Sequence, residues 1–338
     1  MTLLPIFSSG ILLTMTLKGA RPIYLSILLV AILYSSRGFA GELLAQGQNA
    51  EPVQIAIKNV MYHYSAPIAV HIAQAQGELL PTKPGGAVIF DDKSSFVLSL
   101  NYAEASITCN SLARVLNENV FSAANAAIKN LTIENKNNQL IITGKLHEKG
   151  DLGFETTGTL MVESDGRIRL HTEHFKAAHL SLKGLFDALG MDVARAIDAK
   201  KIPGVSTDKD DLILNPTEML PLPSIKGQVT AVRLQDNEIV LIFGAPQPEN
   251  FAAKQPGNYI ALRHGSVQFG KLAMRNSDVI MIDADPRDPF DFFLDRYQNQ
   301  LIAGYSKSTP EFGVRAYVPD YNKIRTHAAG RAKKGRGK

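Results

Sequence analysis

The alternation of apolar and polar residues along the chain predicts many short β-strands separated by turns. Side chains two residues apart lie on the same face of a strand, so this pattern indicates sheets with one buried face. Asp165-Gly166 and Asp236-Asn237 each separate two alternating runs and predict hairpins. The predicted strands cover residues 53–57, 60–64, 68–72, 87–90, 96–100, 131–133, 140–146, 154–162, 167–171, 212–214, 229–234, 239–243, 267–269, 279–282 and 314–318.

Two stretches place apolar residues at helical spacing instead. Asn110-Ser111 is expected to cap a helix that continues to Val120. The stronger pattern follows Ser181, where one continuous stripe contains Leu182, Leu185, Phe186, Leu189, Val193 and Ile197. Shorter helical turns are expected after Asn215-Pro216 and over residues 290–297.

Composition along the chain predicts where its parts begin and end. Residues 41–52 are polar and rich in Gln, and residues 245–257 are rich in Pro and Gln, so both are interpreted as linkers. We therefore expect a main domain over residues 53–244 and a smaller, mostly β C-terminal block over residues 258–322.

The N-terminal segment indicates the compartment. Lys18 and Arg21 precede the apolar run 22–34, which is short for a membrane span and is followed by small residues up to Ala40. Residues 1–40 are thus expected to be an export signal with a periplasmic or envelope destination. The alternative is an uncut signal-anchor, in which residues 22–36 tether the protein to the inner membrane. Met15 would be a more typical start for either segment.

Charge and cysteine content restrict the partners. Three of the 36 basic residues precede residue 41 and seven follow residue 322, which leaves 26 basic against 32 acidic residues in the body. The basic tail 323–338 is expected to be disordered and to act as a solubilising tail, the alternative being contact with an anionic membrane surface. It lacks the aromatic residues that stack on nucleic acid bases. Cys109 is the only cysteine, so no intramolecular disulfide can form, and we interpret it as a small buried hydrophobic residue.

Motifs for catalysis are missing from the sequence. It contains no Gly-x-Ser-x-Gly, no His-Glu-x-x-His and no Gly-rich phosphate loop, so we expect no enzymatic activity and no cofactor. His171 and His174 have the odd spacing that places strand residues on opposite faces, so we interpret them as solvent-facing. Asp283, Asp285 and Asp288 form a weak calcium candidate, for which the alternative is a structural turn anchored by neighbouring Phe residues.

The order of elements over residues 112–243 resembles the LmeA-like phospholipid-binding family, within the tubular lipid-binding (TULIP) superfamily. The stretches that carry the resemblance are SLARVLNENV, LTIE, LIITGKL, GTLMV, GRIRL, LKGLFDALGMDVARAI, DDLILNPTEMLPLPSIKG and QVTAVRLQDNEIVLIFG. The resemblance implies an α+β fold in which a long, curved antiparallel sheet wraps around the amphipathic helix. It also implies an apolar tunnel that holds the acyl chains of phospholipid.

The helix stripe of Leu182, Leu185, Phe186, Leu189 and Val193 needs an apolar partner. The candidates are the sheet residues Leu160, Val162, Ile168 and Leu170. If helix and sheet close fully they form an ordinary core, and if curvature keeps them apart they enclose an acyl-chain pocket. We expect a non-enzymatic lipid-binding or lipid-carrier protein of the envelope. The alternatives are an envelope interaction protein, whose contact surface is the block of Asp and Phe residues around 283–295, and an envelope hydrolase.

Overall fold

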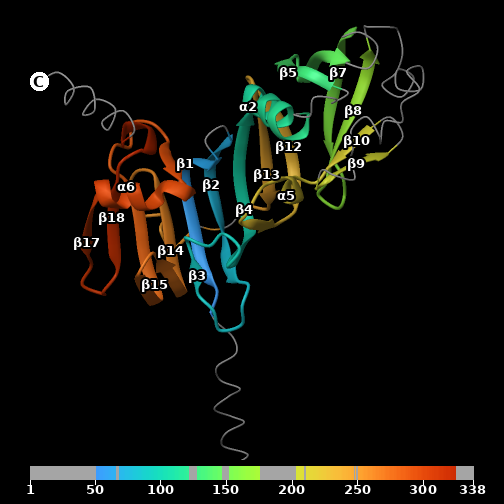
Figure 1. Ribbon diagram of the computed structural model, residues 1–338. Coiled ribbons are helices and arrows are strands. Elements are labelled where there is room, and N and C mark those ends of the chain that lie inside the picture. The colour runs from blue at the N-terminus through green and yellow to red at the C-terminus, as the bar shows by residue number, and fades with distance from the viewer. Residues whose placement is uncertain are drawn as a thin grey trace, which may run out of the picture. The chain divides into compact units, whose positions relative to one another are not determined.

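A computed structural model describes residues 51–65, 68–121, 128–146, 152–175, 203–208, 211–246, 248 and 250–324. The predicted export segment and the amphipathic helix expected at 181–197 lie outside these residues. Within them the fold is rich in β-structure, and the strands form two sheets (Figure 1). None of the helices in this part of the chain is long and apolar enough to cross a membrane.

The larger sheet, sheet A, follows the order β12-β13-β4-β2-β1-β14-β15-β18-β17. These strands are β1 (Val53–Ser65), β2 (Ile68–Pro81), β4 (Phe96–Thr108), β12 (Val229–Gln235), β13 (Glu238–Gly244), β14 (Tyr259–Phe269), β15 (Leu272–Asp283), β17 (Tyr305–Ser308) and β18 (Val314–Val318). Three short strands join them in parallel: β3 (Val88–Ile89) on β14, β11 (Ser224–Lys226) on β4 and β16 (Phe290–Phe293) on β1. β15 and β18 are also parallel, so the expectation of a purely antiparallel sheet is wrong for sheet A.

Strands from both sides of the expected linker 245–257 belong to sheet A. β1 pairs with β14 along five consecutive residues, including Ile55 opposite Leu262 (Figure 1). Residues 258–322 therefore do not form a sheet of their own, because β14 completes the hydrogen bonding of β1. The linker itself is partly packed. Ala252 is buried in a cluster with Tyr259 and Ala261 of β14, and Phe251 packs against that cluster.

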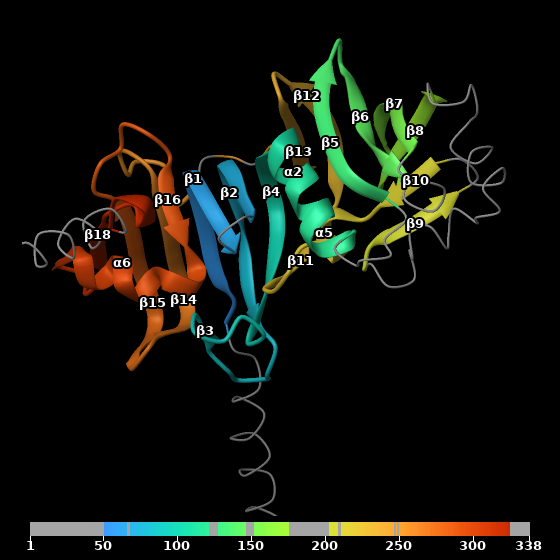
Figure 2. The ribbon, with the colours of Figure 1, turned by 45° about the horizontal axis from the view of Figure 1, so that its top comes forward.

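The smaller sheet, sheet B, is antiparallel throughout in the part of the chain that the structure describes. Its order is β5 (Ile128–Lys136), β6 (Gln139–Leu146), β7 (Leu152–Val162), β8 (Ile168–Phe175), β10 (Asp211–Leu214) and β9 (Val205–Asp208) (Figure 2). The hairpin predicted at Asp165-Gly166 joins β7 to β8, with Gly166 at φ 84°. As the alternation in β7 predicts, Phe154, Thr156 and Gly158 are buried while the residues between them are more exposed.

The helices in the described residues are short. The helix predicted after Asn110-Ser111 is α2 (Cys109–Val115), continued by a π-helical turn over Leu116–Val120, and its cap is Thr108, whose Oγ1 accepts from the Ser111 amide. Cys109 is free and fully buried, as expected. The turn predicted at Asn215-Pro216 is confirmed as α5 (Pro216–Met219).

The helical turn expected over residues 290–297 is wrong for its first half. Phe290–Phe293 form strand β16, followed by a 3-10 turn at Leu294–Arg296 and by α6 (Tyr297–Ala303). All four residues of β16 are buried, so both faces of the strand are covered. A segment of four residues is too short to show a helical or strand period, and tertiary pairing with β1 selects the strand.

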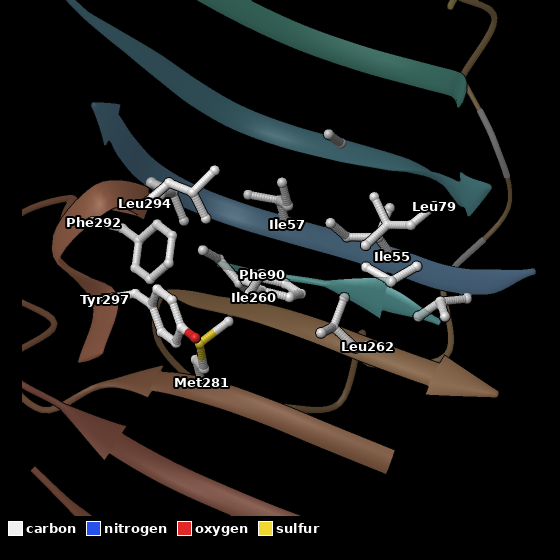
Figure 3. Packing of buried hydrophobic residues seen from close by; sticks show 14 of the residues in the cluster. Ile55, Ile57, Leu79, Phe90, Ile260, Leu262, Met281, Phe292, Leu294 and Tyr297 are labelled. Atoms are coloured by element: carbon white, nitrogen blue, oxygen red, sulfur yellow. The ribbon is translucent and has the colours of Figure 1, made fainter. Parts of the chain in front are cut away.

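Buried apolar side chains form two main clusters. The sheet A cluster centres on β1, β14 and β15, where Ile57, Ile260, Met281 and Phe292 converge (Figure 3). The sheet B cluster joins α2 and sheet B to β13, through Cys109, Ala113, Ile128, Leu131, Ile133, Leu140, Ile142, Phe154, Leu170 and Ile239. Leu160 of β7 and Leu241 of β13 pack against both clusters, so the two sheets meet at these residues.

Candidate ligand-binding cavity

A cavity of about 300 Å³ lies where the sheet A and sheet B clusters meet. We call it the main cavity. Strands β1, β2, β4, β11 and β13 of sheet A and all strands of sheet B line it, together with α2, the π-helical turn and α5. This volume is at the lower end of the roughly 300–1,000 Å³ found for small-molecule pockets.

The lining of the main cavity is apolar almost throughout. Among the described lining residues, only Tyr64, Ser106, Thr156 and Thr172 carry a polar side-chain atom, and none carries a charge. The Ser106 hydroxyl donates to Glu238 Oε2 at 2.7 Å, and the Thr156 hydroxyl lies 3.4 Å from the Thr157 carbonyl. Burial raises the pKa of Tyr64, so its hydroxyl stays neutral at physiological pH. Burying a charged group without a partner is costly, so this lining accepts only the apolar part of a ligand.

The local sequence explains how sheet B presents a smooth apolar face. Gly144 lies opposite Phe154, and a Cβ at residue 144 would come within 2.9 Å of the Phe154 ring. A Cβ at Gly158 would come within 2.6 Å of Leu170 Cδ1. Both glycines leave the space that a neighbouring side chain fills, so Phe154 and Leu170 lie flat on the sheet and border the main cavity.

The sequence-predicted residues of sheet B are brought together in part. Leu160, Ile168 and Leu170 line the main cavity. Val162 does not line it and packs against the sheet A cluster. The helix residues Leu182, Leu185, Phe186, Leu189 and Val193 lie outside the described residues.

Sequence reasoning missed the half of the wall that sheet A supplies. Leu98, Leu100 and Ala103 of β4, with Leu241 and Phe243 of β13, line the main cavity opposite sheet B. Alternation over residues 96–100 and 239–243 marked Leu98, Leu100, Leu241 and Phe243 as facing a core. It carried no information about a second sheet on the other side, because a strand's own sequence does not say which distant sheet it will face.

Two histidines that contact carboxylates, His63 and His171, are not among the residues that line the main cavity. His63 Nε2 is 2.5 Å from Asp291 Oδ1, and His171 Nδ1 is 2.7 Å from Asp211 Oδ1. The side chain of His171 is nearly half exposed, as expected for a solvent-facing residue. Neither pair belongs to the described residues that border the cavity.

The calcium candidates are engaged with protein groups. Asp285 pairs with Arg287 at 2.6 Å and with Lys323 Nζ at 3.0 Å, and Asp288 lies 3.4 Å from Lys323. Asp283 is buried and accepts from Asn258 Nδ2 and from the Asp285 amide. Among the described residues, no group of His, Cys, Asp or Glu side chains has the arrangement of a metal site. This geometry corresponds to the alternative of a structural turn.

Lys323 belongs to this turn rather than to a free tail. Its Nζ lies 2.5 Å from Oδ2 of Asp320, a fully buried carboxylate, in addition to its contacts with Asp285 and Asp288. Lys323 therefore belongs to the folded part of the chain, and the basic tail begins later than the expected residue 323. Hydrogen bonds from Arg287 and Lys323 hold the pKa of Asp285 well below its usual range.

The aromatic residues of the same block do not form a contact surface. Phe290, Phe292 and Phe293 are all buried, and Phe290 and Phe292 belong to the sheet A cluster. The interaction surface expected from the Asp and Phe block is thus wrong in its aromatic half.

Comparisons of the chain with protein-family models, with curated proteins and with solved structures find no match.

Proposed function

We propose that the protein binds the acyl chain of a lipid in the main cavity, without covalent chemistry. The observation that supports this most is the main cavity itself, whose lining of aliphatic and aromatic side chains from two sheets contains no charged residue among those described. Such a lining gains free energy by removing methylene groups from water, at about 0.8 kcal/mol for each CH₂ buried.

The chemistry of the lining favours a flexible aliphatic ligand over a polar or planar one. A polar ligand would lose its hydrogen bonds to water. Among the described lining residues, the side-chain groups that could replace them are the hydroxyls of Ser106, Thr156, Thr172 and Tyr64. Aliphatic side chains dominate around the cavity, with Phe121, Phe154 and Phe243 as the aromatic members besides Tyr64. A lipid would keep its head group outside, where exposed polar side chains and water are available.

The predicted export and the resemblance to a phospholipid-binding family are consistent with a lipid ligand. The apolar run 22–34 indicates export, and lipid is the most abundant apolar molecule near the envelope membranes. The order of elements over residues 112–243 resembles LmeA-like phospholipid-binding proteins. We therefore propose an exported lipid-binding or lipid-carrier protein of the envelope, whose basic residues beyond 324 meet anionic head groups.

The test is to purify the exported protein, extract it with organic solvent and identify the extract by mass spectrometry. A fluorescent fatty acid is then titrated into the delipidated protein, and its uptake is measured. The first variant is Leu241→Trp, which places a larger side chain between the two clusters. The matched control is Leu272→Trp on β15, where the side chain is 56% exposed and does not line the cavity.

We expect lipid in the extracts of the unchanged protein and of Leu272→Trp. In Leu241→Trp the larger side chain should reduce fatty acid uptake by roughly tenfold or more. Circular dichroism is used to check that both variants remain folded. Protein that is lipid-free and takes up no fatty acid would rule out the proposal. Equal uptake by Leu241→Trp and Leu272→Trp would place the binding site elsewhere.

A further inference from the structure

A second, smaller cavity of about 60 Å³ lies beneath sheet A. We call it the inner cavity. Its lining combines aliphatic residues of β1, β2 and β14 with an aromatic group, namely Tyr62, Tyr64, Phe90, Phe96 and Phe292.

The two cavities share one wall. Five described residues line both of them: Ile57, Tyr64, Ile72, Leu98 and Ile225. We call these five residues the septum. They come from four strands, β1, β2, β4 and β11, and Ile72, Leu98 and Ile225 are only partly buried. An apolar chain that extends from the main cavity past these side chains enters the inner cavity.

Away from the septum, the inner cavity is bordered by side chains of the sheet A cluster. Phe90 packs on Phe96 and Phe269, with ring centroids 6.1 and 4.5 Å away. Ile260, Phe292 and Leu294 are buried beside Phe90, and Figure 3 shows these residues converging with Ile55 and Ile57. Close-packed aromatic side chains yield little, so they limit how far a bound chain can extend on this side.

From this geometry we infer that the inner cavity is the subsite for the terminal methyl end of the bound acyl chain, and that the septum determines which chain lengths fit. This inference rests on the proposed function, since it names the part of the ligand that enters deepest. A chain short enough to end at the septum fills the main cavity alone. A longer chain must displace Ile72, Leu98 or Ile225 to bury its last carbon atoms.

Septum residues are therefore specificity-determining residues for chain length. Ile225 is the septum residue whose substitution should disturb the sheet least, because β11 is only three residues long and pairs with β4. Ile225→Ala opens the septum, and each further methylene that reaches the inner cavity should then tighten binding roughly fourfold. Ile225→Phe narrows the same passage and should shift the preference to shorter chains.

The experiment measures displacement of a fluorescent fatty acid by a homologous series of saturated fatty acids. It compares the unchanged protein with Ile225→Ala, Ile225→Phe and the control Leu212→Ala. Leu212 lines the main cavity but not the inner one, so its removal enlarges the site without opening the septum. Ile72→Ala tests the septum a second time from β2, in case Ile225 variants do not fold.

The expected result is a shift of the optimum toward longer chains in Ile225→Ala and Ile72→Ala, toward shorter chains in Ile225→Phe, and no shift in Leu212→Ala. If the unchanged protein binds fatty acid and all variants keep its chain-length profile, this inference fails while the proposed function stands. If the unchanged protein binds no fatty acid, both fail.

Discussion

The ring of Phe154 in β7 lies against the backbone of Gly144 in β6, at a distance that leaves no room for a Cβ at residue 144. Gly144→Ala must therefore move the Phe154 ring, which borders the main cavity. We expect a loss of stability of roughly 1–3 kcal/mol, typical of overpacking, together with weaker fatty acid uptake. Chemical denaturation and the uptake assay measure the two effects.

The control for this variant is Gly153→Ala, one residue before Phe154. A Cβ there meets nothing within 4 Å, so stability should stay within about 0.5 kcal/mol. Equal behaviour of the two alanine variants would mean that the close approach of Phe154 to Gly144 has no energetic consequence.

Leu262 on β14 tests whether residues 258–322 fold together with the strands before them. Its side chain is fully buried and its backbone pairs with Ile55 of β1. Leu262→Ala should cost about 2–5 kcal/mol and move the whole unfolding transition, because one sheet contains both parts of the chain. Urea unfolding followed by circular dichroism and by tyrosine fluorescence gives the comparison.

Leu272→Ala, at an exposed position on β15, is the matched control and should be close to neutral. Two separate transitions, only one of them shifted by Leu262→Ala, would show that the C-terminal residues unfold as an independent block.

Lys323 neutralises Asp320, whose side chain is fully buried. Lys323→Met should destabilise the protein by roughly 2 kcal/mol at pH 7, less than the ~3–5 kcal/mol typical of a buried pair, because Lys323 itself is 37% exposed. Burial already raises the pKa of Asp320 above its ordinary value, and loss of the ammonium raises it further.

The pH dependence of Lys323→Met follows from the raised pKa of Asp320. A carboxyl whose folded-state pKa is raised is stabilised by protonation, so its destabilising effect is present above that pKa and disappears as the pH falls through it. The difference in stability between Lys323→Met and the unchanged protein should thus shrink between pH 7 and pH 4. A difference that is constant or grows on acidification would contradict the assignment to Asp320.

The Asn258 side chain connects β1 to β15. It accepts from Asn59 Nδ2 at 2.9 Å and donates to Asp283 Oδ2 at 2.8 Å, and Asn59 in turn lies 2.8 Å from His71 Nε2. Asn258→Ala removes a partner from the buried Asp283 carboxylate and should cost about 1–3 kcal/mol by thermal or urea unfolding. Asn101→Ala, at an exposed position of β4, is the control, and a similar cost in both would mean that the buried contacts of Asn258 are not what matters.

Local patterns predicted most of the elements, because they depend on neighbours in the chain. The alternation in β7 and the turn at Asp165-Gly166 place Phe154, Thr156 and Gly158 on a buried face, as observed. The same reasoning failed at Phe290–Phe293, where a run of four residues is too short to have a period, and where pairing with β1 decides the outcome.

The candidate site could be predicted only in part for the same reason. Leu160, Ile168 and Leu170 were identifiable as an apolar face in need of a partner, and all three line the main cavity. Their partners in β4 and β13 could not be identified, since nothing in a strand's own sequence says which distant strand or sheet it will face.

The sequence by itself determined where most of the strands and turns lie, that Cys109 is a buried hydrophobic residue, and that the N-terminal segment has the features of an export signal. Each of these follows from local spacing, composition or the size of one side chain. Only the tertiary structure decided that β14 joins β1 in a single sheet, that Lys323 closes the acidic turn, and that two apolar faces leave about 300 Å³ between them. These features depend on how residues far apart in the chain pack, because whether two faces close into a core or enclose a cavity is set by the shape of both together.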